Sequence, residues 1–390
     1  MKYYIIAGEA SGDLHGSNLI RELLNLDKGA IIRCWGGGLM EQAGGKLVKH
    51  YEELAFMGFI EVIKNLPTII ANMKFCKKDI QQFAPDVLVL IDYPGFNLRM
   101  AKWAKEAGYK VIYYISPQVW AWKENRVKLI KRVVDKMLVI LPFEKEFYHN
   151  WDYNVVYVGH PLVQVVEERL NDTTNLLISF SPSNENIGDK TARSQEPANK
   201  DIIALLPGSR KQEIMVKLPI MLEASKQFPQ YDFIISQAPS QPIELYNKLL
   251  TGYPNIKVAF AGQTYTLLKK STAALVTSGT ATLETALFGV PQVVCYKGSA
   301  ISYQIAKRLI SIKYISLVNL IMDKPVVTEL IQNDLTVSNI VKELNAILYD
   351  ASRLTQMRED YDRLRKQLKQ NEGASARAAQ EIVDFLQSTS

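Results

Sequence analysis

Two segments in the second half of the chain combine a short apolar run with a loop that suits phosphate binding. The first reads ALLPGSR, and its predicted strand ends at Gly208, Ser209 and Arg210, directly before a helical pattern. A glycine lets the backbone approach a phosphate, free N–H groups of the helix start point toward it, and an arginine adds a bidentate cation. On this segment alone, an ordinary strand–helix turn with a solvated arginine explains the pattern equally well.

The second segment reads SGTATLE, and it makes a nucleotide diphosphate the favoured ligand. Ser278, Gly279 and Thr280 open a predicted helix, and Glu284 lies one turn further along the same helix face. Helix-start amides and hydroxyls suit a pyrophosphate, whereas a carboxylate suits ribose hydroxyls. A helix cap at Thr280 with a surface charge at Glu284 is the simpler alternative. Two phosphate-type loops in one half favour the nucleotide, as in the nucleotide-sugar half of two-domain glycosyltransferases.

No divalent metal is expected beside this nucleotide. The segment lacks an Asp-x-Asp motif, and its nearest acids, Glu213 and Glu284, are too isolated in the sequence to form a cation cage. Positive donors and helix ends would then hold the diphosphate. The sequence therefore predicts no metal site and no cofactor.

The opening loop, GEASGD, follows the first apolar run but differs from a phosphate loop. It carries Glu9 and Asp13, two acids where a phosphate would need positive donors. Because carboxylates suit the hydroxyls of a sugar, we expect this loop to contact a sugar and not a phosphate.

Apolar runs alternate with helical patterns in both halves of the chain, which predicts parallel sheets covered on both faces. In the first half the runs are KYYIIAGE, AIIRCWGGG, DVLVLIDYPG, KVIYYISP and DKMLVILPF. In the second half they are DIIALLPGSR, YDFIISQAP, IKVAFAG, AALVTSGT and PQVVCYKG. Ligands of such sheets sit beyond the carboxyl ends of the strands, where the loops described above lie.

The predicted fold class is therefore α/β, with two Rossmann-like, doubly wound parallel-sheet domains facing each other across a cleft. The first domain covers residues 1–165, and a flexible loop or linker follows at 166–200, most of it rich in Asn, Ser and Thr. The second domain covers 201–350. Charged helices at 351–390, broken near Gly373, are expected to pack on the first domain or on a partner chain.

Composition limits the function classes. The 390 residues carry a net charge of +6, too low to indicate nucleic-acid binding but suited to phosphorylated ligands or an anionic surface. The three cysteines, Cys34, Cys76 and Cys295, are too widely spaced for a disulfide framework or a zinc site. No signal peptide is recognisable and no apolar run reaches about 18 residues, so we expect a cytoplasmic protein without a membrane span.

A series of segments, in order from residue 4 to about residue 335, closely resembles the lipid-A-disaccharide synthase family. They are AGEASGDLHG, GGGLMEQAG, ELAFMGFIEV, IDYPGFN, YYISPQVWAWKENRVKLIKRVVD, LPFEKEFY, YVGHPL, LLPGSR and SGTATLE. Several of these segments are not shared with other glycosyltransferases, which makes the resemblance specific. Only residues 171–200 and the C-terminal helices match loosely.

The resemblance implies the two-domain GT-B fold of glycosyltransferase family 19 and an inverting transfer. A 2,3-diacylglucosamine unit would pass from its UDP form to the 6-hydroxyl of 2,3-diacylglucosamine 1-phosphate. The products would be a β(1→6)-linked lipid A disaccharide 1-phosphate and UDP. The resemblance also implies a location at the cytoplasmic face of the inner membrane of Gram-negative bacteria.

An inverting transfer needs a base for the acceptor hydroxyl, and the resemblance assigns this role to Asp92. The alternative role of Asp92 is a cap of the turn DYPGFN. Some relatives carry a second acid where this chain has Gly95, which concentrates the prediction on Asp92. We expect Glu9, Ser11 and Asp13 to contact the acceptor or the donor sugar, with a helix cap as the alternative for Asp13.

The resemblance adds further candidates to both halves. His160 in YVGHPL is a candidate sugar contact at the cleft, although a histidine before a proline is as often structural. Gln263 matches the uracil-facing loop, and Asn319 and Glu329 match positions near the diphosphate or donor sugar. Lys324 stands near the position where relatives carry a cation.

Both expected substrates carry acyl chains, so the chain must reach a membrane surface without spanning it. Residues 53–75 are rich in Phe, Met and Ile and would lie in the interface, unless they form a core helix. In NRVKLIKRVVDK, Lys128, Lys131, Arg132 and Lys136 mark a basic face, unless it is simply solvated; basic residues contribute roughly 1 kcal/mol each near anionic lipid. Peripheral attachment is therefore expected, and a homodimer is a further predicted state.

Two other functions are compatible with the same fold. A UDP-sugar 2-epimerase needs a similar diphosphate site but no acyl-lipid surface, and formation of UDP-N-acetylmannosamine would favour it. A non-catalytic lipid- or nucleotide-binding GT-B protein would bind UDP without turnover. Neither function accounts for the segments of the first half.

Overall fold

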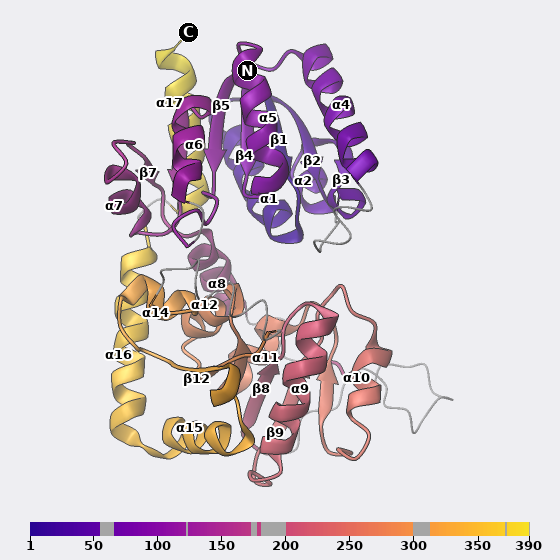
Figure 1. The fold of residues 1–390 in the computed structure, drawn as a ribbon, viewed down its shortest axis with the longest axis vertical. Coiled ribbons are helices and arrows are strands. Elements are labelled where there is room, and N and C mark those ends of the chain that lie inside the picture. The colour runs from indigo at the N-terminus through magenta and orange to yellow at the C-terminus, as the bar shows by residue number, and fades with distance from the viewer. Residues whose placement is uncertain are drawn as a thin grey trace. The chain divides into compact units, whose positions relative to one another are not determined.

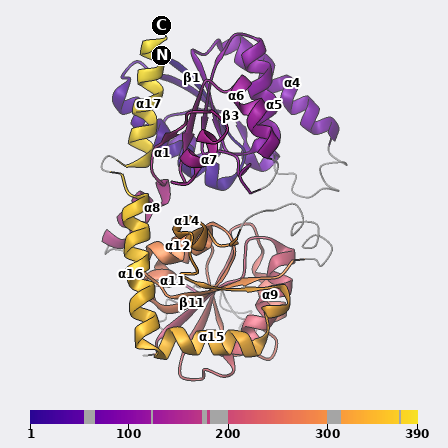
Figure 2. The ribbon, with the colours of Figure 1, turned by 60° about the vertical axis from the view of Figure 1, so that its left-hand side comes forward.

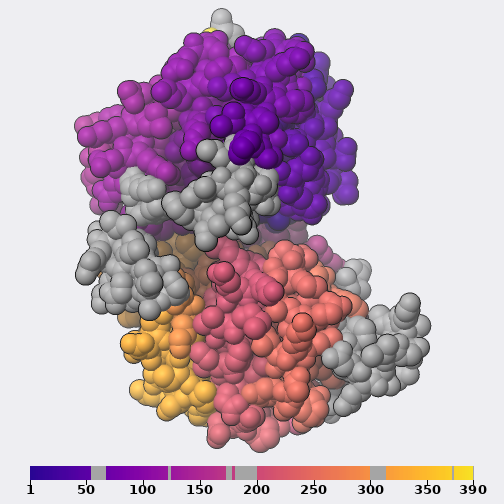
Figure 3. Space-filling view, turned by 45° about the vertical axis from the view of Figure 1, so that its right-hand side comes forward, coloured from indigo at the N-terminus to yellow at the C-terminus, as the bar shows by residue number. Residues whose placement is uncertain are grey.

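The chain divides into two compact units, each built around its own parallel sheet (Figure 1). A computed structural model describes residues 1–54, 66–121, 124–172, 178–180, 200–298, 313–370 and 373–389. The first unit comprises Met1–Pro161 with Leu368–Ser390, and the second comprises Leu162–Gln367. In the space-filling view the side chains of each unit lie closely packed (Figure 3). The two sheets confirm the α/β class that the alternating pattern predicts.

The described strands of the first unit form a seven-stranded sheet in the order β3-β2-β1-β4-β5-β6-β7. They are β1 (Lys2–Ala7), β2 (Ile31–Gly36), β3 (Lys46–His50), β4 (Val87–Ile91), β5 (Lys110–Tyr114), β6 (Lys136–Val139) and β7 (Val156–Tyr157). β1 and β4 pair in parallel at the centre of the sheet. Their side chains are buried on both faces, which is typical of a covered parallel sheet.

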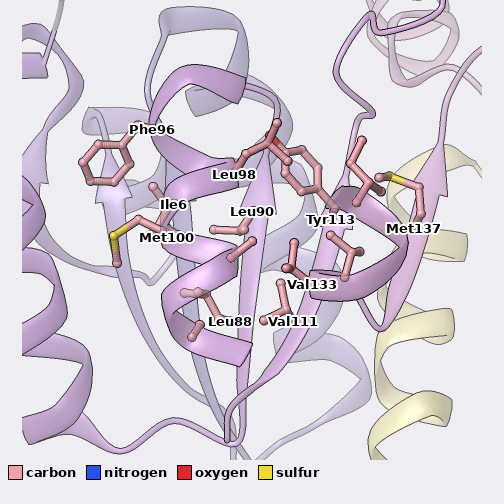
Figure 4. Close-up of a cluster of buried hydrophobic side chains, with 14 of the residues drawn as sticks. Ile6, Leu88, Leu90, Phe96, Leu98, Met100, Val111, Tyr113, Val133 and Met137 are labelled. Carbon is pink, nitrogen blue, oxygen red and sulfur yellow. The ribbon is translucent and has the colours of Figure 1, made fainter. Parts of the chain in front are cut away.

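Helices cover both faces of this first sheet. They are α1 (Ala10–Leu26), α2 (Gly38–Gln42), α4 (Leu66–Phe83), α5 (Pro94–Glu106), α6 (Val127–Val133), α7 (Glu144–His149) and α17 (Ala374–Ser388). α1 and α17 lie side by side (Figure 2). α4, α5 and α6 cover the opposite face, where their apolar residues form one cluster with strand residues such as Ile6 and Leu90 (Figure 4).

The described strands of the second unit form a six-stranded parallel sheet in the order β10-β9-β8-β11-β12-β13. They are β8 (Ile202–Leu206), β9 (Asp232–Ser236), β10 (Lys257–Ala259), β11 (Ser271–Thr277), β12 (Gln292–Tyr296) and β13 (Thr328–Ile331). The helices of this unit are α8 (Pro161–Asn171), α9 (Lys211–Ser225), α10 (Ile243–Leu249), α11 (Thr264–Lys270), α12 (Thr280–Leu287), α14 (Leu317–Met322), α15 (Val337–Tyr349) and α16 (Ala351–Leu368). α9 packs against α10 and α15, whereas α11 belongs to the cluster on the other face of the sheet.

Three expectations about the organisation need correction. Residues 166–171, predicted as linker, end helix α8, because the apolar side chains of PLVQVV are buried. The helices predicted together at 351–390 divide between the units at Leu368. α16 stays with the second unit because Asp360 pairs with Lys324 and Arg365 donates to the Leu287 carbonyl.

The third correction concerns Lys136, which was expected on a basic helix face. Lys136 begins strand β6 instead, and its Nζ lies 2.6 Å from a carboxylate oxygen of Glu381 on α17. The pair helps to hold the C-terminal helix on the first unit. Gly373 precedes α17 with a φ of +81°, and the predicted helix break near this residue is confirmed.

Candidate active site

A candidate nucleotide pocket lies at the centre of the second sheet, where the strand order reverses. β8 and β11 are neighbours there, but the chain continues from β8 toward β9 and from β11 toward β12, on opposite sides. In doubly wound sheets this switch point is the usual ligand crevice. A pocket of about 400 Å³ opens at it. Its lining includes these predicted residues: Gly208, Ser209, Arg210, Ser278, Gly279, Thr280 and Glu284.

Two glycines shape the loops of this pocket. Gly208 and Gly279 have φ angles of +118° and +141°, a backbone region that L side chains rarely adopt. A Cβ at Gly208 would also lie 2.4 Å from Glu213 Oε2. Gly279 is the N-cap of α12, and Gly208 comes shortly before Arg210, the N-cap of α9. The free N–H groups of two helix starts therefore lie beside the pocket.

Charged side chains form a small network at the start of α9. The side chain of Arg210 is 68% exposed, and its Nη1 lies 3.8 Å from Glu213 Oε1. The Nζ of Lys217, which is buried, lies 3.9 Å from Glu213 Oε2. Burial lowers the pKa of Lys217, an effect that Glu213 opposes. At this distance and exposure, the guanidinium of Arg210 is free to turn toward a bound anion.

The other side of the pocket offers a carboxyl group and several hydroxyls. Burial raises the pKa of Glu284, whereas the hydrogen bond that Tyr265 Oη donates to it, at 2.7 Å, opposes the rise. Thr277 Oγ1 is buried and lacks a hydrogen-bond partner among the described residues. The hydroxyls of Ser236 and Thr264 bond to each other at 2.7 Å. A few fixed polar groups of this kind can orient a nucleoside.

The last residue of β9 and the loop after it also line the pocket, and sequence reasoning missed them. Ser236, Gln237, Ala238 and Pro239 all belong to the lining. The next two residues bind the phosphate-type loop, because Ser240 Oγ and Gln241 Nε2 both donate to the carbonyl of Ser209. The polar run SQAPSQ after a predicted strand was the available signal, since it marks the same sheet edge.

Gln263 and Lys324 lie outside this pocket lining. Gln263 Oε1 accepts the N–H of Ser179 at 2.7 Å, and the residue lines a separate pocket of about 70 Å³. Its neighbour Thr264 does line the nucleotide pocket. Lys324 pairs with Asp360 at 2.6 Å, within the second unit.

Asn319 and Glu329 hold the turn before α14. The carboxylate of Glu329 accepts the N–H groups of Ile315 and Ser316, at 3.0 and 2.9 Å, and the amide of Asn319 at 2.9 Å. Ser278 Oγ in turn donates to the Ile315 carbonyl at 2.8 Å. Within the described residues, Asn319 and Glu329 thus support the Ser278 loop through Ile315 and do not line the pocket themselves.

The first unit has the equivalent switch point between β1 and β4, and it carries acids. Glu9 is the exposed N-cap of α1, and Asp92 directly follows β4. Burial and then the charge of Glu9 raise the pKa of Asp92 to about 7, although the N–H of Tyr93 opposes the rise. A carboxyl with such a pKa can take up a proton near neutral pH, as a general base must. Ser11 is exposed in the first turn of the same α1.

Asp13 has a different role from the predicted sugar contact. Only 4% of the residue is exposed. Its carboxylate accepts the N–H groups of Gly37, Leu39 and Met40, at 2.7, 3.2 and 3.0 Å. Asp13 therefore caps α2, which agrees with the alternative of a helix cap but on another helix.

His160 is buried beside a second histidine. Burial, and then His15, lower the pKa of His160 to about 3, and burial lowers the pKa of His15 to about 4. The backbone N–H of His160 donates to the Leu368 carbonyl at 3.2 Å. This geometry is that of a neutral, packed histidine, and it favours the structural alternative over a sugar contact.

Sequence reasoning also missed a buried acid of the first unit. Glu144, in LPFEKEFY, is 1% exposed, and its Oε2 accepts the N–H of Leu141 at 3.0 Å. Burial raises the pKa of Glu144 to about 8, while hydrogen bonds from Leu141 and Ser116 oppose the rise. Ser116 Oγ also bonds to Tyr148 Oη at 2.7 Å. Glu144 thus belongs to an internal network that joins the loops after β5 and β6.

The described part of the chain holds neither a cluster of metal ligands nor a membrane-spanning helix. No group of three or more His, Cys, Asp or Glu side chains is arranged there to hold a metal ion. None of the helices in the described part of the chain is both long and apolar enough to cross a membrane. The three cysteines are buried and unpaired with one another.

Known proteins resemble nearly the whole chain. Residues 3–383 match the family model described as Lipid-A-disaccharide synthetase. A lipid-A-disaccharide synthase of Trichlorobacter lovleyi is 38% identical over 368 residues, which are 93% of this chain and 92% of that protein. The same enzyme of Syntrophus aciditrophicus is 39% identical and covers 96% of this chain and 95% of its own.

Solved structures of other proteins share the architecture. A UDP-GlcNAc 2-epimerase of Neisseria meningitidis, bound to UDP-GlcNAc, aligns over 100% of both chains with a TM-score of 0.65 and 14% identity. The glycotransferase of kitacinnamycin covers 99% of this chain and 98% of its own, with a TM-score of 0.63 and 12% identity. Identities this low show the GT-B fold alone. The family match and the relatives at 38–39% identity decide the function: the chain belongs to the lipid-A-disaccharide synthase family, and it is a glycosyltransferase.

Proposed function

We propose that the chain transfers 2,3-diacylglucosamine from its UDP form to the 6-hydroxyl of 2,3-diacylglucosamine 1-phosphate, with Asp92 as the general base. Family membership supports a nucleotide-sugar donor and a lipid acceptor. The observation that carries the role of Asp92 is its position at a switch point beside Glu9, where its pKa rises to about 7. A base of this pKa is half unprotonated near neutral pH.

The transfer requires one proton movement and one exchange of bonds. The oxygen of the acceptor 6-hydroxyl attacks the anomeric carbon while its proton passes to the carboxylate of Asp92. The bond from the anomeric carbon to the UDP oxygen breaks, and attack from the opposite side inverts the configuration. Arg210 and the starts of α9 and α12 would stabilise the negative charge on the departing UDP. Glu9 and Ser11, both exposed, would contact sugar hydroxyls.

Measurement of UDP release tests this proposal. In the presence of EDTA, we expect release from UDP-2,3-diacylglucosamine only when the acceptor is added. Asp92→Asn should lower kcat by about 10²- to 10⁴-fold, because the base is lost. Asp86→Asn is the matched control, since Asp86 lies at the other end of β4 and binds the N–H of Lys2 at 2.7 Å.

Each result that would contradict this proposal points to a different explanation. Release without acceptor would contradict the transfer, and an unaffected Asp92→Asn variant would place the base elsewhere. UDP-N-acetylmannosamine formed from UDP-N-acetylglucosamine would indicate an epimerase, and UDP binding without any turnover would indicate a binding protein.

We further propose peripheral attachment to an anionic membrane through the face of the first unit that carries α4 and α6. Lys128 and Arg132 of α6 are exposed, and Lys131 Nζ binds the Trp151 carbonyl at 2.6 Å. On α4, Ile70 and Phe75 are 46% and 48% exposed. Residues 55–65 of the apolar segment predicted at 53–75 lie outside the described residues.

Vesicle sedimentation tests the attachment. We expect binding to vesicles of phosphatidylglycerol and phosphatidylethanolamine but not to phosphatidylcholine alone. Lys128→Glu with Arg132→Glu should weaken binding by more than tenfold, because each basic residue contributes roughly 1 kcal/mol near anionic lipid. Lys248→Glu with Lys342→Glu, exposed on the second unit, is the control. A homodimer stays a prediction, which light scattering of the purified protein would test.

A further inference from the structure

The backbone at the end of β4 has an unusual conformation. Asp92 and Tyr93, two successive residues that are not glycine, have φ angles of +43° and +48°. Such left-handed conformations cost roughly 1–3 kcal/mol each and persist only where the surrounding structure holds them. A group that holds this backbone must therefore exist nearby.

Two buried side chains hold the carbonyl of Asp92. Tyr113 Oη donates to this oxygen at 2.5 Å, and Asn97 Nδ2 donates to it at 2.8 Å. Asn97 Nδ2 also lies 3.1 Å from the Ile91 carbonyl. The N–H of Asp92, on the other side of the residue, donates to the Tyr114 carbonyl at 3.2 Å. Both peptide groups of Asp92 are thus fixed.

The two donors are themselves firmly placed. Tyr113 and Asn97 are fully buried. The ring of Tyr113 belongs to the hydrophobic cluster drawn in Figure 4, together with Leu90, Phe96 and Leu98. Asn97 lies in the first turn of α5, and its N–H donates to the Tyr93 carbonyl at 3.0 Å. Burial raises the pKa of Tyr113 well above its ordinary value, so this hydroxyl stays a donor at neutral pH.

The held backbone also connects the two acids of the switch point. A Cβ at Gly8 would lie 2.3 Å from the ring of Tyr93, so this ring packs directly against the loop that carries Glu9. A change in the backbone at Asp92 and Tyr93 would therefore move the carboxyl of Asp92 relative to Glu9. Displacement of a reacting group by about 1 Å can lower a rate about 10²-fold.

We propose that Tyr113 and Asn97 are positioning residues for the transfer reaction, which hold the left-handed backbone at Asp92 and so fix its carboxyl beside Glu9. The inference rests on the proposed function, in which Asp92 is the base. It adds two residues that act through Asp92 and need not touch either substrate.

Removal of a single hydroxyl tests the proposal. Tyr113→Phe leaves the ring in the cluster but removes the donor to Asp92. We expect kcat to fall about 10- to 100-fold, with less than a threefold change in KM for donor and acceptor. The acid limb of the pH–kcat profile should also move to lower pH by half a unit or more, because a released carboxyl gains contact with water.

The matched control is Tyr4→Phe. Tyr4 is equally buried in the same sheet, but its hydroxyl binds Asp79 at 2.7 Å. Its kcat and acid limb should match those of the wild type. Asn97→Ser removes the second donor and should repeat the fall in kcat and the shift of the limb. All variants are measured below their thermal midpoints.

Three results can be told apart. If Tyr113→Phe and Asn97→Ser lose no more kcat than Tyr4→Phe while Asp92→Asn is inactive, the positioning role is wrong but the base is retained. If kcat falls without any shift of the acid limb in either variant, the two residues only maintain the fold and do not position the carboxyl of Asp92. This result also contradicts the proposal. If Asp92→Asn turns over like the wild type, the proposed base itself is wrong.

Discussion

The two units share one strand order over six strands, yet their switch points carry opposite chemistry. Between β8 and β11 the loops turn on glycines, Gly208 and Gly279, and present Arg210 with two helix starts. Between β1 and β4 the corresponding loops present Glu9 and Asp92. The order of the strands places a crevice at the same point of each sheet. The few residues that follow the central strands then decide whether the crevice can bind an anion or accept a proton.

The two switch points also differ in how their backbones reach a positive φ. The anion-type loops reach positive φ with glycine, which has no Cβ to clash. The loop after β4 reaches it with Asp92 and Tyr93, neither of which is glycine, and the carboxyl of Asp92 is the base of the proposed reaction. In the proposed function, the second unit therefore binds the diphosphate partly with its backbone, whereas the first unit holds a side chain in place.

The largest effects should separate the two switch points, because one change should raise the Kd for UDP and the other should lower kcat. Arg210→Ala should weaken UDP binding by about 10- to 100-fold, because a hydrogen bond to a charged group contributes about 1.5–3 kcal/mol. Asp92→Asn should leave UDP binding within twofold but lower kcat as described. Isothermal titration with UDP measures the first effect, and Lys226→Ala, exposed at the far end of α9, is the control. Equal loss of UDP affinity in Arg210→Ala and Asp92→Asn would contradict the division of roles between the two switch points.

The pH dependence of kcat/KM should be set by the acids at the switch point between β1 and β4. A base must be unprotonated, so kcat/KM should fall about tenfold per pH unit below a pKa of about 7 for Asp92. Glu9→Gln removes the second cause of the raised pKa, so the acid limb should move to lower pH, while burial still keeps it above an ordinary aspartate. Glu106→Gln, 66% exposed on α5, serves as control and should not move the limb. A limb that stays in place in Glu9→Gln would show that Glu9 does not act on the base.

Substitution of a glycine tests the switch point between β8 and β11. Gly208→Ala strains the loop and brings a Cβ to 2.4 Å from Glu213, so UDP affinity should fall about tenfold. Gly252→Ala is the matched control, because Gly252 has a φ of +91° with no atom near the added Cβ. Both changes should lower the free energy of unfolding by about 1 kcal/mol. If both variants bind UDP equally, the loop at Gly208 does not form the site.

Much of the fold was predictable because buried parallel strands are continuous apolar runs. Each of the ten quoted runs became a strand. β3, β7 and β13 were missed because their sequences, KLVKH, VY and TELI, are short or half-exposed and lack such a run. They lie at sheet edges, where one neighbour is missing and burial is weaker.

The candidate sites were predictable only where one segment holds both the strand end and the helix start. ALLPGSR and SGTATLE are such segments, and all the residues singled out in them line one pocket. The role of Asp13 depends on Gly37 and Met40, and that of Asp92 on Tyr113. Such partners are distant in the sequence, and only the packing of the sheet brings them together.

The smallest expected effect tests the strain at the acidic switch point directly. Replacement of alanine by glycine usually destabilises a protein by about 0.5–1 kcal/mol, because glycine loses more freedom on folding. At position 92 the order should reverse, since glycine adopts a φ of +43° without strain while alanine is disfavoured there by about 1–2 kcal/mol. Urea unfolding of Asp92→Gly and Asp92→Ala at one pH measures the difference, and both variants lack the buried carboxyl, so its desolvation cancels. A less stable glycine variant would mean that the backbone relaxes once the carboxyl is gone. The side chain of Asp92, and not the hydrogen bonds from Tyr113 and Asn97, would then set the conformation.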